Sequence, residues 1–516
     1  MAVAQPLVPP VGAPSRGGFP ALPPIGSLQK PAIPNAAPTR SCESLATVAL
    51  PNTTIESAAV DARDPNICRV TAITTHPPAG DKIKIWIAIP ISNWNGRFVG
   101  TGGGGFAGGN AGGVNQPVAI GYASGATDTG HDGGSGSFAL DSNGRLNWQS
   151  IRDNAHVGIH EMTVTGKALT QAMYGVAPRY SYFNGCSTGG RQGLMEAQRY
   201  PEDYNGIVAG APAINWTKLI LQSMWGTLQM AVANDPLPAC KLTAATKAVI
   251  AACDALDGVK DGVIGDPQRC TFDPKVLIGT SAGECGSFTQ ADTDILRKIW
   301  QGPRREDGTF LWYGQSMGAD LNAMAASRGT PLAPQLFAFT SDWLKYFITQ
   351  NPQYDWTTIT SAAYNNFWDQ SQEEYGTVIG TDNPDLTPFR DHGGKVILWH
   401  GWADQLITGQ GTIDYYKRVQ QQMGGPKKTS DFARLFMAPG VGHCGGGAGP
   451  SPYGQLDAIV SWVEDGKAPA TLPTNPRGPA GSAQKPPPLC QYPLVSKYKG
   501  TGSTDDATNF VCSENY

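Results

Sequence analysis

A serine stands between glycines at the junction of a predicted strand and a predicted helix. Residues 180–201 read YSYFNGCSTGGRQGLMEAQRYP and contain the pattern Gly185-x-Ser187-x-Gly189. Between a strand and a helix, this pattern forms a sharp turn that exposes the serine hydroxyl above a sheet, and its glycines relieve the crowding that side chains would cause. The segment therefore predicts a nucleophilic serine. The alternative is a glycine-rich turn whose serine takes no part in chemistry.

A serine nucleophile needs a histidine base and a carboxylate that orients the base. In α/β-hydrolases the three residues follow in the order serine, acid, histidine, with each partner on a loop after a strand. Asp404 follows the apolar run KVILWHGWA and His443 follows LFMAPGVG, so both order and context are met. Asp391 and Asp414 are competing carboxylates, but neither follows a predicted buried strand. The sequence thus predicts a triad of Ser187, His443 and Asp404.

Three further histidines have spacings that need an interpretation. His400 precedes Asp404 by four residues and lies inside the predicted strand. We expect it to line the pocket or to support Asp404, and the alternative is a hydrogen-bonded core histidine. His156 and His160 are four residues apart, as zinc ligands on one helix face would be. The HExxH pattern fails because Val157 replaces the glutamate, so we interpret this pair as structural.

Two of the ten cysteines adjoin the proposed catalytic residues. Cys186 directly precedes Ser187, and Cys444 directly follows His443. A disulfide between them would tie the serine turn to the histidine loop and hold the two side chains close together; the alternative is a chance placement. No two cysteines form a Cys-x-x-Cys pair, and their even number favours five disulfides and a secreted or periplasmic protein.

Composition excludes several classes of protein. With 516 residues, the chain is long enough for one large α/β domain with an insertion or for two to three ordinary domains. Lys and Arg total 38 against 42 Asp and Glu, so no broad basic surface for nucleic acid is predicted. No apolar run of about 18 residues predicts a membrane span. The N-terminus lacks the basic and apolar regions of a signal peptide, and we interpret it as a mature chain with an added Met.

Strands and helices alternate along residues 41–212 and again along 389–516, which predicts a mainly parallel sheet with helices on both faces. Between these parts, residues 213–388 contain short helices, tryptophans and four cysteines, and we expect them to form a lid domain with its own small core. Residues 1–40 are rich in proline and predict an extended arm. The clearest predicted strands cover residues 82–91, 97–109, 119–131, 393–404 and 432–444, and the clearest helices cover 160–175 and 453–466.

The predicted strand 97–109 runs into the glycine loop GTGGGGFAGG. An ester carbonyl that is attacked by serine develops negative charge, which preorganised N–H donors stabilise. One donor should be the backbone N–H of Thr188, directly after the nucleophile, and the other should come from this glycine loop. A phosphate-binding role is less consistent with the sequence, because no GKS or GKT follows and no convincing helix opens after the loop.

A short acidic loop, CDALDGVKDGVIGD at residues 253–266, holds Asp254, Asp257 and Asp261. Carboxylates so close together repel one another unless a cation or solvent neutralises them, and hard oxygen ligands suit calcium. The spacing is not that of an EF-hand. From spacing alone, a metal loop and a solvated turn are equally open.

The segments GCSTGGRQGLMEAQRYPEDYNGIVAGAP, HGWADQLI and GVGHCGGG together resemble the tannase and feruloyl esterase family, whose members carry a Cys-Ser, Asp, His-Cys constellation. The resemblance runs from about residue 40 to near the C-terminus and implies an α/β-hydrolase fold with a large lid insertion. It assigns Ser187 as nucleophile, His443 as general base and acid, and Asp404 as the residue that orients His443. It also points to Gly104 as the second oxyanion donor, with Gly105 as the near alternative.

The resemblance also favours a structural calcium in the acidic loop and no organic cofactor. It implies as ligands the side chains of Asp254, Asp257 and Asp261 and the carbonyls of Val259 and Val263. It further implies disulfides Cys253–Cys270 and Cys490–Cys512, while Cys42–Cys68 is expected from proximity along the chain. That leaves Cys240 and Cys285, where the chain departs from the usual family pattern, as the fifth expected pair.

The activity that follows is that of a secreted serine carboxylesterase acting on a small aromatic ester. Feruloyl and other hydroxycinnamoyl esters are favoured over gallate esters and mono(2-hydroxyethyl) terephthalate, which other family members hydrolyse. A serine peptidase and a catalytically inactive binding protein are the alternatives from other classes. Nothing in the sequence indicates an oligomeric state.

Aromatic residues of the expected lid are candidates for a slot that accepts the aromatic acyl group, although each is more often core than substrate contact. They are Trp216, Trp225, Trp312, Tyr313, Phe337, Phe339, Trp343, Tyr346 and Phe347.

Overall fold

A nine-stranded sheet forms the centre of the computed structural model, which describes residues 30–476 and 485–514. The strand order is β1-β2-β3-β5-β4-β6-β7-β10-β11. The first three strands pair in antiparallel fashion, β3 pairs antiparallel with β5, and all later neighbours pair in parallel. The strands are β1 (Thr53–Val60), β2 (Ile67–Thr74), β3 (Ile83–Pro90), β4 (Arg97–Thr101), β5 (Ala123–Thr127), β6 (Tyr180–Cys186), β7 (Gly206–Gly210), β10 (Lys395–Gly401) and β11 (Ala433–Ala438).

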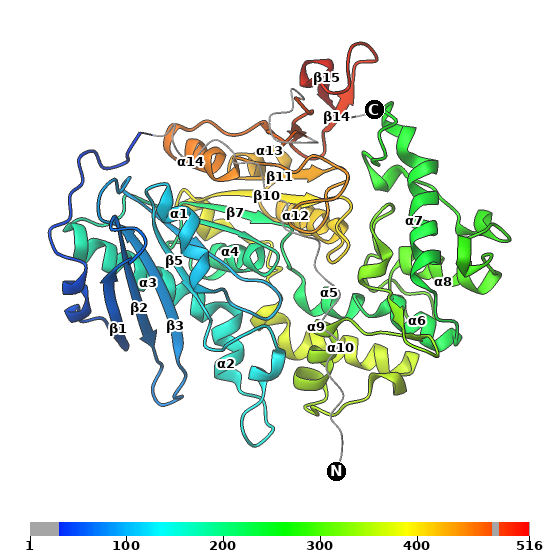
Figure 1. Cartoon of the computed structure of the whole chain (residues 1–516), viewed down its shortest axis with the longest axis horizontal. Coiled ribbons are helices and arrows are strands. Elements are labelled where there is room, and N and C mark those ends of the chain that lie inside the picture. The colour runs from blue at the N-terminus through cyan, green and yellow to red at the C-terminus, as the bar shows by residue number, and fades with distance from the viewer. Residues whose placement is uncertain (1–29, 477–484, 515–516) are drawn as a thin grey trace.

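Helices cover both faces of this sheet, as expected for central parallel strands whose side chains are buried on both sides (Figure 1). On β6, Phe183 packs into the core formed with α3 and α4, whereas Tyr182 packs into the core formed with α14. The helices beside the sheet are α1 (Asn115–Ala119), α2 (Trp148–Arg152), α3 (Gly158–Tyr174), α4 (Thr188–Arg199), α11 (Thr387–Asp391), α12 (Gly409–Gln422), α13 (Pro426–Ser430) and α14 (Gln455–Asp465).

Residues 211–386, between β7 and α11, form a helical insertion at the right of Figure 1. Trp343 and Phe347 are fully buried in one of its hydrophobic clusters, and Leu242 and Leu296 are fully buried in another. Its elements are α5 (Trp216–Gln222), α6 (Trp225–Ala233), α7 (Ala239–Cys253), α8 (Gln290–Gln301), β8 (Ser327–Arg328), β9 (Ala333–Pro334), α9 (Ala338–Asp342) and α10 (Ser361–Ile379). The cluster around Trp343 and Phe347 also contains Phe106 and Ile151 from outside the insertion, so the insertion packs against the rest of the chain, and the expected division at residues 213–388 stays a prediction.

Several predicted elements are shorter in the structure. The predicted strand 97–109 ends at Thr101, because glycines and a tight turn follow it. A π-helical turn, Asp153–Val157, precedes α3, and the sequence pattern gave no sign of it. Most of the expected N-terminal arm, residues 1–29, lies outside the described residues.

All ten cysteines are paired in the structure, which contains five disulfides. The pairs are those expected from the sequence: Cys42–Cys68, Cys186–Cys444, Cys240–Cys285, Cys253–Cys270 and Cys490–Cys512. The small hairpins β12 (Thr471–Leu472) with β13 (Leu489–Cys490), and β14 (Val495–Tyr498) with β15 (Phe510–Ser513), lie in the C-terminal segment. The last disulfide therefore links the two hairpins.

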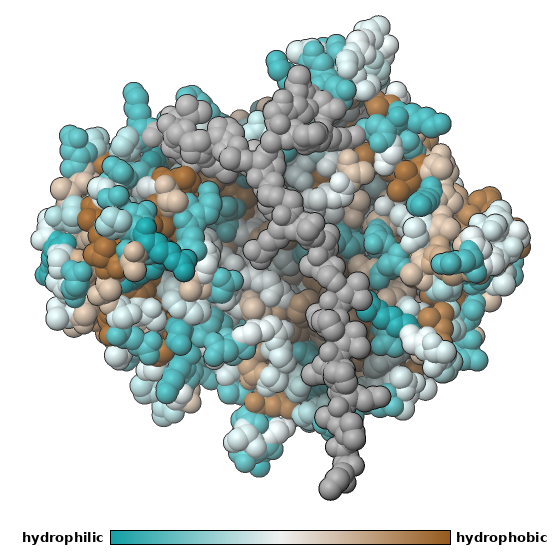
Figure 2. All heavy atoms as spheres, viewed as in Figure 1, coloured by the Kyte–Doolittle hydropathy of each residue, from teal (hydrophilic) through white to brown (hydrophobic). Residues whose placement is uncertain are grey.

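Hydrophobic residues on the face shown in Figure 2 form separate groups among hydrophilic ones. Within the described part of the chain, no helix has both the length and the apolar character that crossing a membrane requires.

Candidate active site

Ser187 stands at the turn between β6 and α4 with φ 62° and ψ −124°. This conformation is strained for a residue with a side chain, at a cost of about 1–3 kcal/mol, and such strain clusters at functional sites. The turn is tight enough that a Cβ on Gly185 would lie 2.5 Å from the carbonyl carbon of Gly189. The Ser187 N–H donates to the Gly210 carbonyl of β7 at 2.9 Å, which fixes the turn to the neighbouring strand. The backbone at Ser187 therefore forms the sharp turn that the sequence pattern predicts.

Asp404 and His443 form the hydrogen bond that a catalytic acid and base require. His443 Nδ1 lies 2.8 Å from Asp404 Oδ2, and Asp404 is 2% exposed. The other oxygen, Oδ1, accepts the backbone N–H groups of Leu406 at 2.8 Å and Ile407 at 2.9 Å. Burial alone would raise the pKa of Asp404, but the hydrogen bonds from His400 and His443 outweigh it and hold that pKa well below its usual value. Asp404 is consequently ionised and oriented.

His400 is a second histidine on the same carboxylate oxygen. It is fully buried on β10, and its Nε2 lies 3.1 Å from Asp404 Oδ2 and 3.0 Å from the Ile407 carbonyl. Both partners are acceptors, so Nε2 carries the proton, while Nδ1 accepts the Thr412 hydroxyl at 2.8 Å. His400 thus supports Asp404 by a hydrogen bond, which is one of the two roles expected for it.

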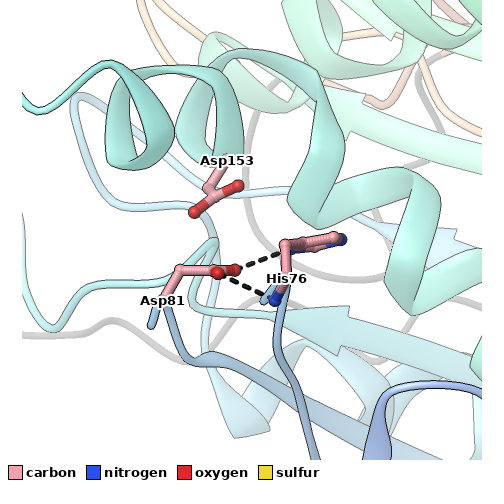
Figure 3. Close-up of side chains that lie close together, drawn as sticks. All are labelled: His76, Asp81 and Asp153. Atoms are coloured by element: carbon pink, nitrogen blue, oxygen red, sulfur yellow. Dashed lines mark hydrogen bonds and ion pairs between the residues drawn. The ribbon is translucent and has the colours of Figure 1, made fainter. Parts of the chain in front are cut away.

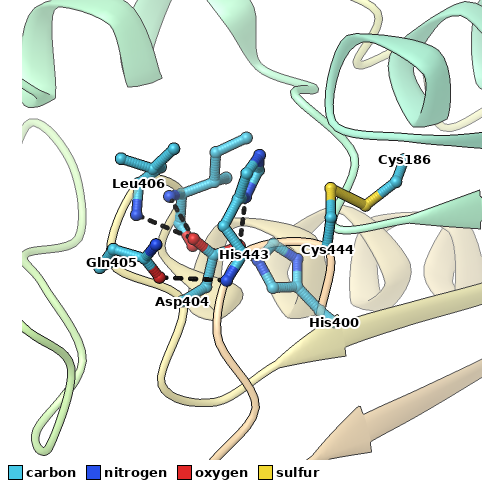
Figure 4. The surroundings of a disulfide bond; sticks show 8 residues. Cys186, His400, Asp404, Gln405, Leu406, His443 and Cys444 are labelled. Carbon is cyan, nitrogen blue, oxygen red and sulfur yellow. Dashed lines mark hydrogen bonds and ion pairs between the residues drawn. A yellow bond between two sulfur atoms is a disulfide. The ribbon is translucent and has the colours of Figure 1, made fainter. Parts of the chain in front are cut away.

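The disulfide Cys186–Cys444 joins the serine turn to the histidine loop, with the two Cα atoms 5.9 Å apart (Figure 4). Ser187 and His443 line one pocket between the sheet and the helical insertion. The structure therefore brings together all three residues of the predicted triad, whereas Asp391 is exposed and Asp414 pairs with Arg418 at 3.0 Å.

The wall of this pocket is apolar and comes largely from the insertion. Phe339 packs so closely on Gly105 that a Cβ at that glycine, whose φ is +61°, would lie 2.3 Å from the phenyl ring. Leu406 and Ile407, two and three residues after Asp404, also line the pocket. The other apolar lining residues are Ala213, Trp216, Leu219, Ile220, Met324 and Phe337.

Three of the nine aromatic residues expected near the substrate, Trp216, Phe337 and Phe339, line the pocket. The other six belong to the core of the insertion or pack against it. Sequence reasoning missed Leu219, Ile220 and Met324, because nothing in their local pattern distinguishes a pocket wall from a helix core. Leu406 and Ile407 had a usable signal, since they lie within three residues of the catalytic-acid candidate.

A family model described as tannase and feruloyl esterase matches residues 68–513. The chain belongs to the tannase and feruloyl esterase family. It is 38% identical to a probable feruloyl esterase of Arthroderma benhamiae over 90% of this chain and 87% of that relative. It is 33% identical to feruloyl esterase B of Aspergillus niger, over 87% of each chain. Among solved structures, feruloyl esterase B from Aspergillus oryzae superposes with a TM-score of 0.80 and 29% identity, over 92% of this chain and 99% of that one.

Family membership confirms the resemblance and the α/β-hydrolase fold inferred from the sequence. This member of the family is a carboxylic ester hydrolase, and the site around Ser187 brings the predicted nucleophile, base and buried acid together. An organic cofactor is not expected for such an enzyme.

The glycine loop of this esterase is held against the start of α4. Gly103 N–H donates to the Gln192 side chain at 3.0 Å, and Gly189 N–H donates to the Gly103 carbonyl at 3.0 Å. Thr188, the first residue of α4, donates its hydroxyl to the Gly105 carbonyl at 2.6 Å. Gly105 and Thr188 are among the described residues that line the pocket, and Gly104 is not. The loop is thus preorganised for N–H donation, while the choice between Gly104 and Gly105 stays a prediction.

The acidic loop folds around Asp254, whose Oδ1 accepts backbone N–H groups from residues 261, 262 and 263 at 3.0–3.2 Å. Asp257, Val259, Asp261 and Val263 line one cavity beside the C-terminal segment. Burial, with smaller contributions from the charges of Asp261 and Asp254, raises the pKa of Asp257 to about 6. Carboxylates and carbonyls are the ligands that Ca²⁺ prefers, so the donor set fits the ion. The aspartates are nonetheless not among the described groups with three ligand atoms within 4.8 Å of one another.

Replacing His400 should impair catalysis without blocking substrate binding. We expect His400→Leu to lower kcat about 10- to 100-fold with little change in KM, because a hydrogen bond to a charged group contributes about 1.5–3 kcal/mol. His400→Gln should retain more activity, since its amide can donate to Asp404. An equal loss of kcat in His400→Leu and His400→Gln would indicate packing rather than hydrogen bonding, and an unchanged kcat in His400→Leu would contradict this role.

Removing the central disulfide should cost activity as well as stability. We expect the double variant Cys186→Ala, Cys444→Ala to lose kcat/KM at a temperature where circular dichroism shows it folded, because the serine turn and the histidine loop are no longer tied. Cys42→Ala, Cys68→Ala is the matched control, since it removes a disulfide at the far edge of the sheet. If both double variants keep the same kcat/KM, the tie has no catalytic role.

Proposed function

We propose that this esterase is a secreted serine carboxylesterase that hydrolyses esters of aromatic acids, with feruloyl and related hydroxycinnamoyl esters favoured. The observation that carries the proposal is the apolar pocket that holds Ser187 and His443 together. The names of the most similar relatives support feruloyl esters as the substrate class. Five disulfides support an oxidising compartment outside the cytoplasm.

In the proposed mechanism, His443 Nε2 accepts the Ser187 proton while Oγ attacks the ester carbonyl. Asp404 stabilises the imidazolium that forms, and the Thr188 N–H with an N–H of the glycine loop, at Gly104 or its neighbour Gly105, stabilises the oxyanion. Collapse of this intermediate breaks the ester C–O bond, and His443 returns the proton to the departing alcohol. Water, activated by His443, then hydrolyses the acyl-enzyme and regenerates Ser187.

The chemistry of the pocket ranks the candidate substrates. A feruloyl ring carries one hydroxyl and one methoxy group, so it suits a wall built mainly of aromatic and aliphatic side chains. A galloyl ring would bury three hydroxyls, and each costs free energy where it lacks a partner. A terephthaloyl group would bring a carboxylate, and no Arg or Lys is among the described residues that line the pocket. The proposed preference is therefore feruloyl, then galloyl, then terephthaloyl esters.

We also propose that the helical insertion, residues 213–388 in the expected division, is a lid that carries a structural calcium ion. Asp254, Asp257 and Asp261 and the carbonyls of Val259 and Val263 would hold it. Bound calcium would supply charge neutralisation to the acidic loop. No step at Ser187 depends on it.

Hydrolysis of three esters tests the proposed activity and its preference. Wild type and Ser187→Ala should be compared on methyl ferulate, methyl gallate and mono(2-hydroxyethyl) terephthalate. We expect methyl ferulate to have the highest kcat/KM and the alanine variant to lose at least about 10³-fold in kcat, since the nucleophile is absent. Retained activity in Ser187→Ala would exclude this serine as nucleophile.

A chromogenic amide and a fluorophosphonate probe separate the rival classes in the same experiment. A serine peptidase would cleave the amide at a rate comparable to the ester, and an inactive binding protein would leave the probe unreacted. We expect slow or no amide cleavage and labelling at Ser187.

Chelation tests the calcium site separately from the chemistry. We expect EGTA to lower Tm and added Ca²⁺ to restore it, because an ion at about 100 times its Kd stabilises the folded state by about 2.7 kcal/mol. Asp257→Asn should melt close to EGTA-treated wild type and respond little to Ca²⁺. Activity on methyl ferulate at 25 °C should change little. A Tm that EGTA leaves unchanged would remove the metal from the proposal.

A further inference from the structure

A cluster of ionisable side chains lies outside the serine site. It is located where the turn after β2 meets the π-helical turn before α3 (Figure 3). His76 Nδ1 is 2.7 Å from Asp81 Oδ2, and His76 N–H donates to Asp81 Oδ1 at 2.8 Å. Asp153 lies opposite them, and one potential ligand atom from each of the three residues lies within 4.8 Å of the others. The fourth neighbour is Glu161 of α3, whose Oε1 is 3.3 Å from His76 Nε2.

Asp153 is 1% exposed, yet only one of its carboxylate oxygens is satisfied. Oδ1 accepts the Gln149 amide at 2.8 Å, whereas Oδ2 has no hydrogen-bond partner within residues 30–476 and 485–514. Leaving a buried carboxylate oxygen without a partner is costly. Burial, opposed by the Gln149 hydrogen bond and assisted by the charge of Asp81, raises the pKa of Asp153 to about 7. Oδ2 of Asp153 therefore lacks a positively charged partner.

The residues around Asp81 and Asp153 do not supply a positively charged partner for Asp153 Oδ2. The Asp81 side chain is 3% exposed, and His76 is the residue with which it forms an ion pair in the described chain. His76 is 28% exposed, so an ion from solvent can reach the cluster.

We propose that His76, Asp81 and Asp153 bind a divalent transition-metal ion of the Zn²⁺ class. One imidazole nitrogen and two carboxylate oxygens are ligand types of zinc sites, and water would complete a fourth position, because Glu161 lies at the other ring nitrogen of His76. The imidazole makes Ca²⁺ and Mg²⁺, which take oxygen ligands, the wrong ions for this cluster. The site is therefore distinct in both place and chemistry from the acidic loop at residues 253–266.

The ion would act as a structural clamp. It would join the turn after β2 to the first residue of the π-helical turn, which is Asp153. The next residue, Asn154, donates its amide to the Phe106 carbonyl at 2.9 Å and to the Thr129 hydroxyl at 3.2 Å. Since Phe106 is part of the glycine loop, the clamp would stiffen this loop.

A second cluster, His160, Glu196 and Asp203, has similar spacing but a different charge balance. Lys167 Nζ lies 3.9 Å from Asp203 Oδ1, so a cation already occupies this neighbourhood. Burial and the charge of Asp203 raise the pKa of Glu196 well above its usual value, which keeps this carboxyl protonated. The second cluster is thus the natural control for the first.

Zinc binding to the metal-free full chain tests the proposal, by competition with a chromogenic chelator. We expect wild type to bind Zn²⁺ at one site, and Asp153→Asn and His76→Gln to weaken that binding at least about tenfold, because each removes one ligand. Asp203→Asn, Asp257→Asn and the exposed-histidine control His392→Gln should bind as wild type does. Co²⁺ in place of Zn²⁺ should give visible absorption bands that His76→Gln loses or shifts.

Two results would overturn the site. One is the absence of stoichiometric Zn²⁺ binding to folded wild type; the other is binding that survives Asp153→Asn and His76→Gln unchanged, or that Asp203→Asn abolishes. Thermal melts provide an independent measurement. Zn²⁺ should raise the Tm of wild type and not that of His76→Gln, a partly exposed position where the substitution is expected to fold. An equal rise in both proteins contradicts the clamp.

Discussion

The loops that carry the serine and the histidine start from strands that are not neighbours. In the sheet, β6 and β11 are separated by β7 and β10, which places their ends about 14 Å apart at about 4.8 Å for each strand step. The two cysteines beside the catalytic candidates nevertheless have Cα atoms 5.9 Å apart. The histidine loop must therefore lean back across two strand ends, and the disulfide Cys186–Cys444 holds it there. The placement of Ser187 and His443 in one pocket and the proposed proton transfer depend on this covalent closure.

A buried charge is the second constraint on the site. Asp404 has two backbone N–H donors on one oxygen and two histidines on the other. Satisfying all of these lone pairs offsets the cost of removing a carboxylate from water. It also fixes the ring of His443, which lines the same pocket as Ser187, through the same oxygen that His400 supports. The catalytic geometry is thus maintained by groups that never approach a substrate.

Local patterns were sufficient to predict the residues around Ser187, because a nucleophile turn needs glycines at fixed positions and its partners follow strands in a fixed order. The end of β4 at Thr101 was harder to predict, because residues 97–109 mix apolar residues and glycines without a clear boundary. Leu219, Ile220 and Met324 could not be predicted as pocket lining, because contacts between the insertion and the sheet leave no periodic signal. His76 and Asp153 are likewise separated along the chain by three strands, and only the fold places them together.

Phe339 of the insertion packs closely on Gly105 of the glycine loop, so residues expected to act in the chemistry lie beside residues expected to select the substrate. The sheet and its loops carry the proposed nucleophile, the proposed base and the expected oxyanion donors, whereas Phe337, Phe339 and Met324 of the insertion form much of the apolar wall of the pocket. A change confined to the insertion can therefore alter which acids are accepted while the hydrolytic machinery stays intact. Within one such scaffold, the choice of ester can diverge by remodelling a single face of the cleft, and the absence of a side chain at residue 105 is what lets that face come close.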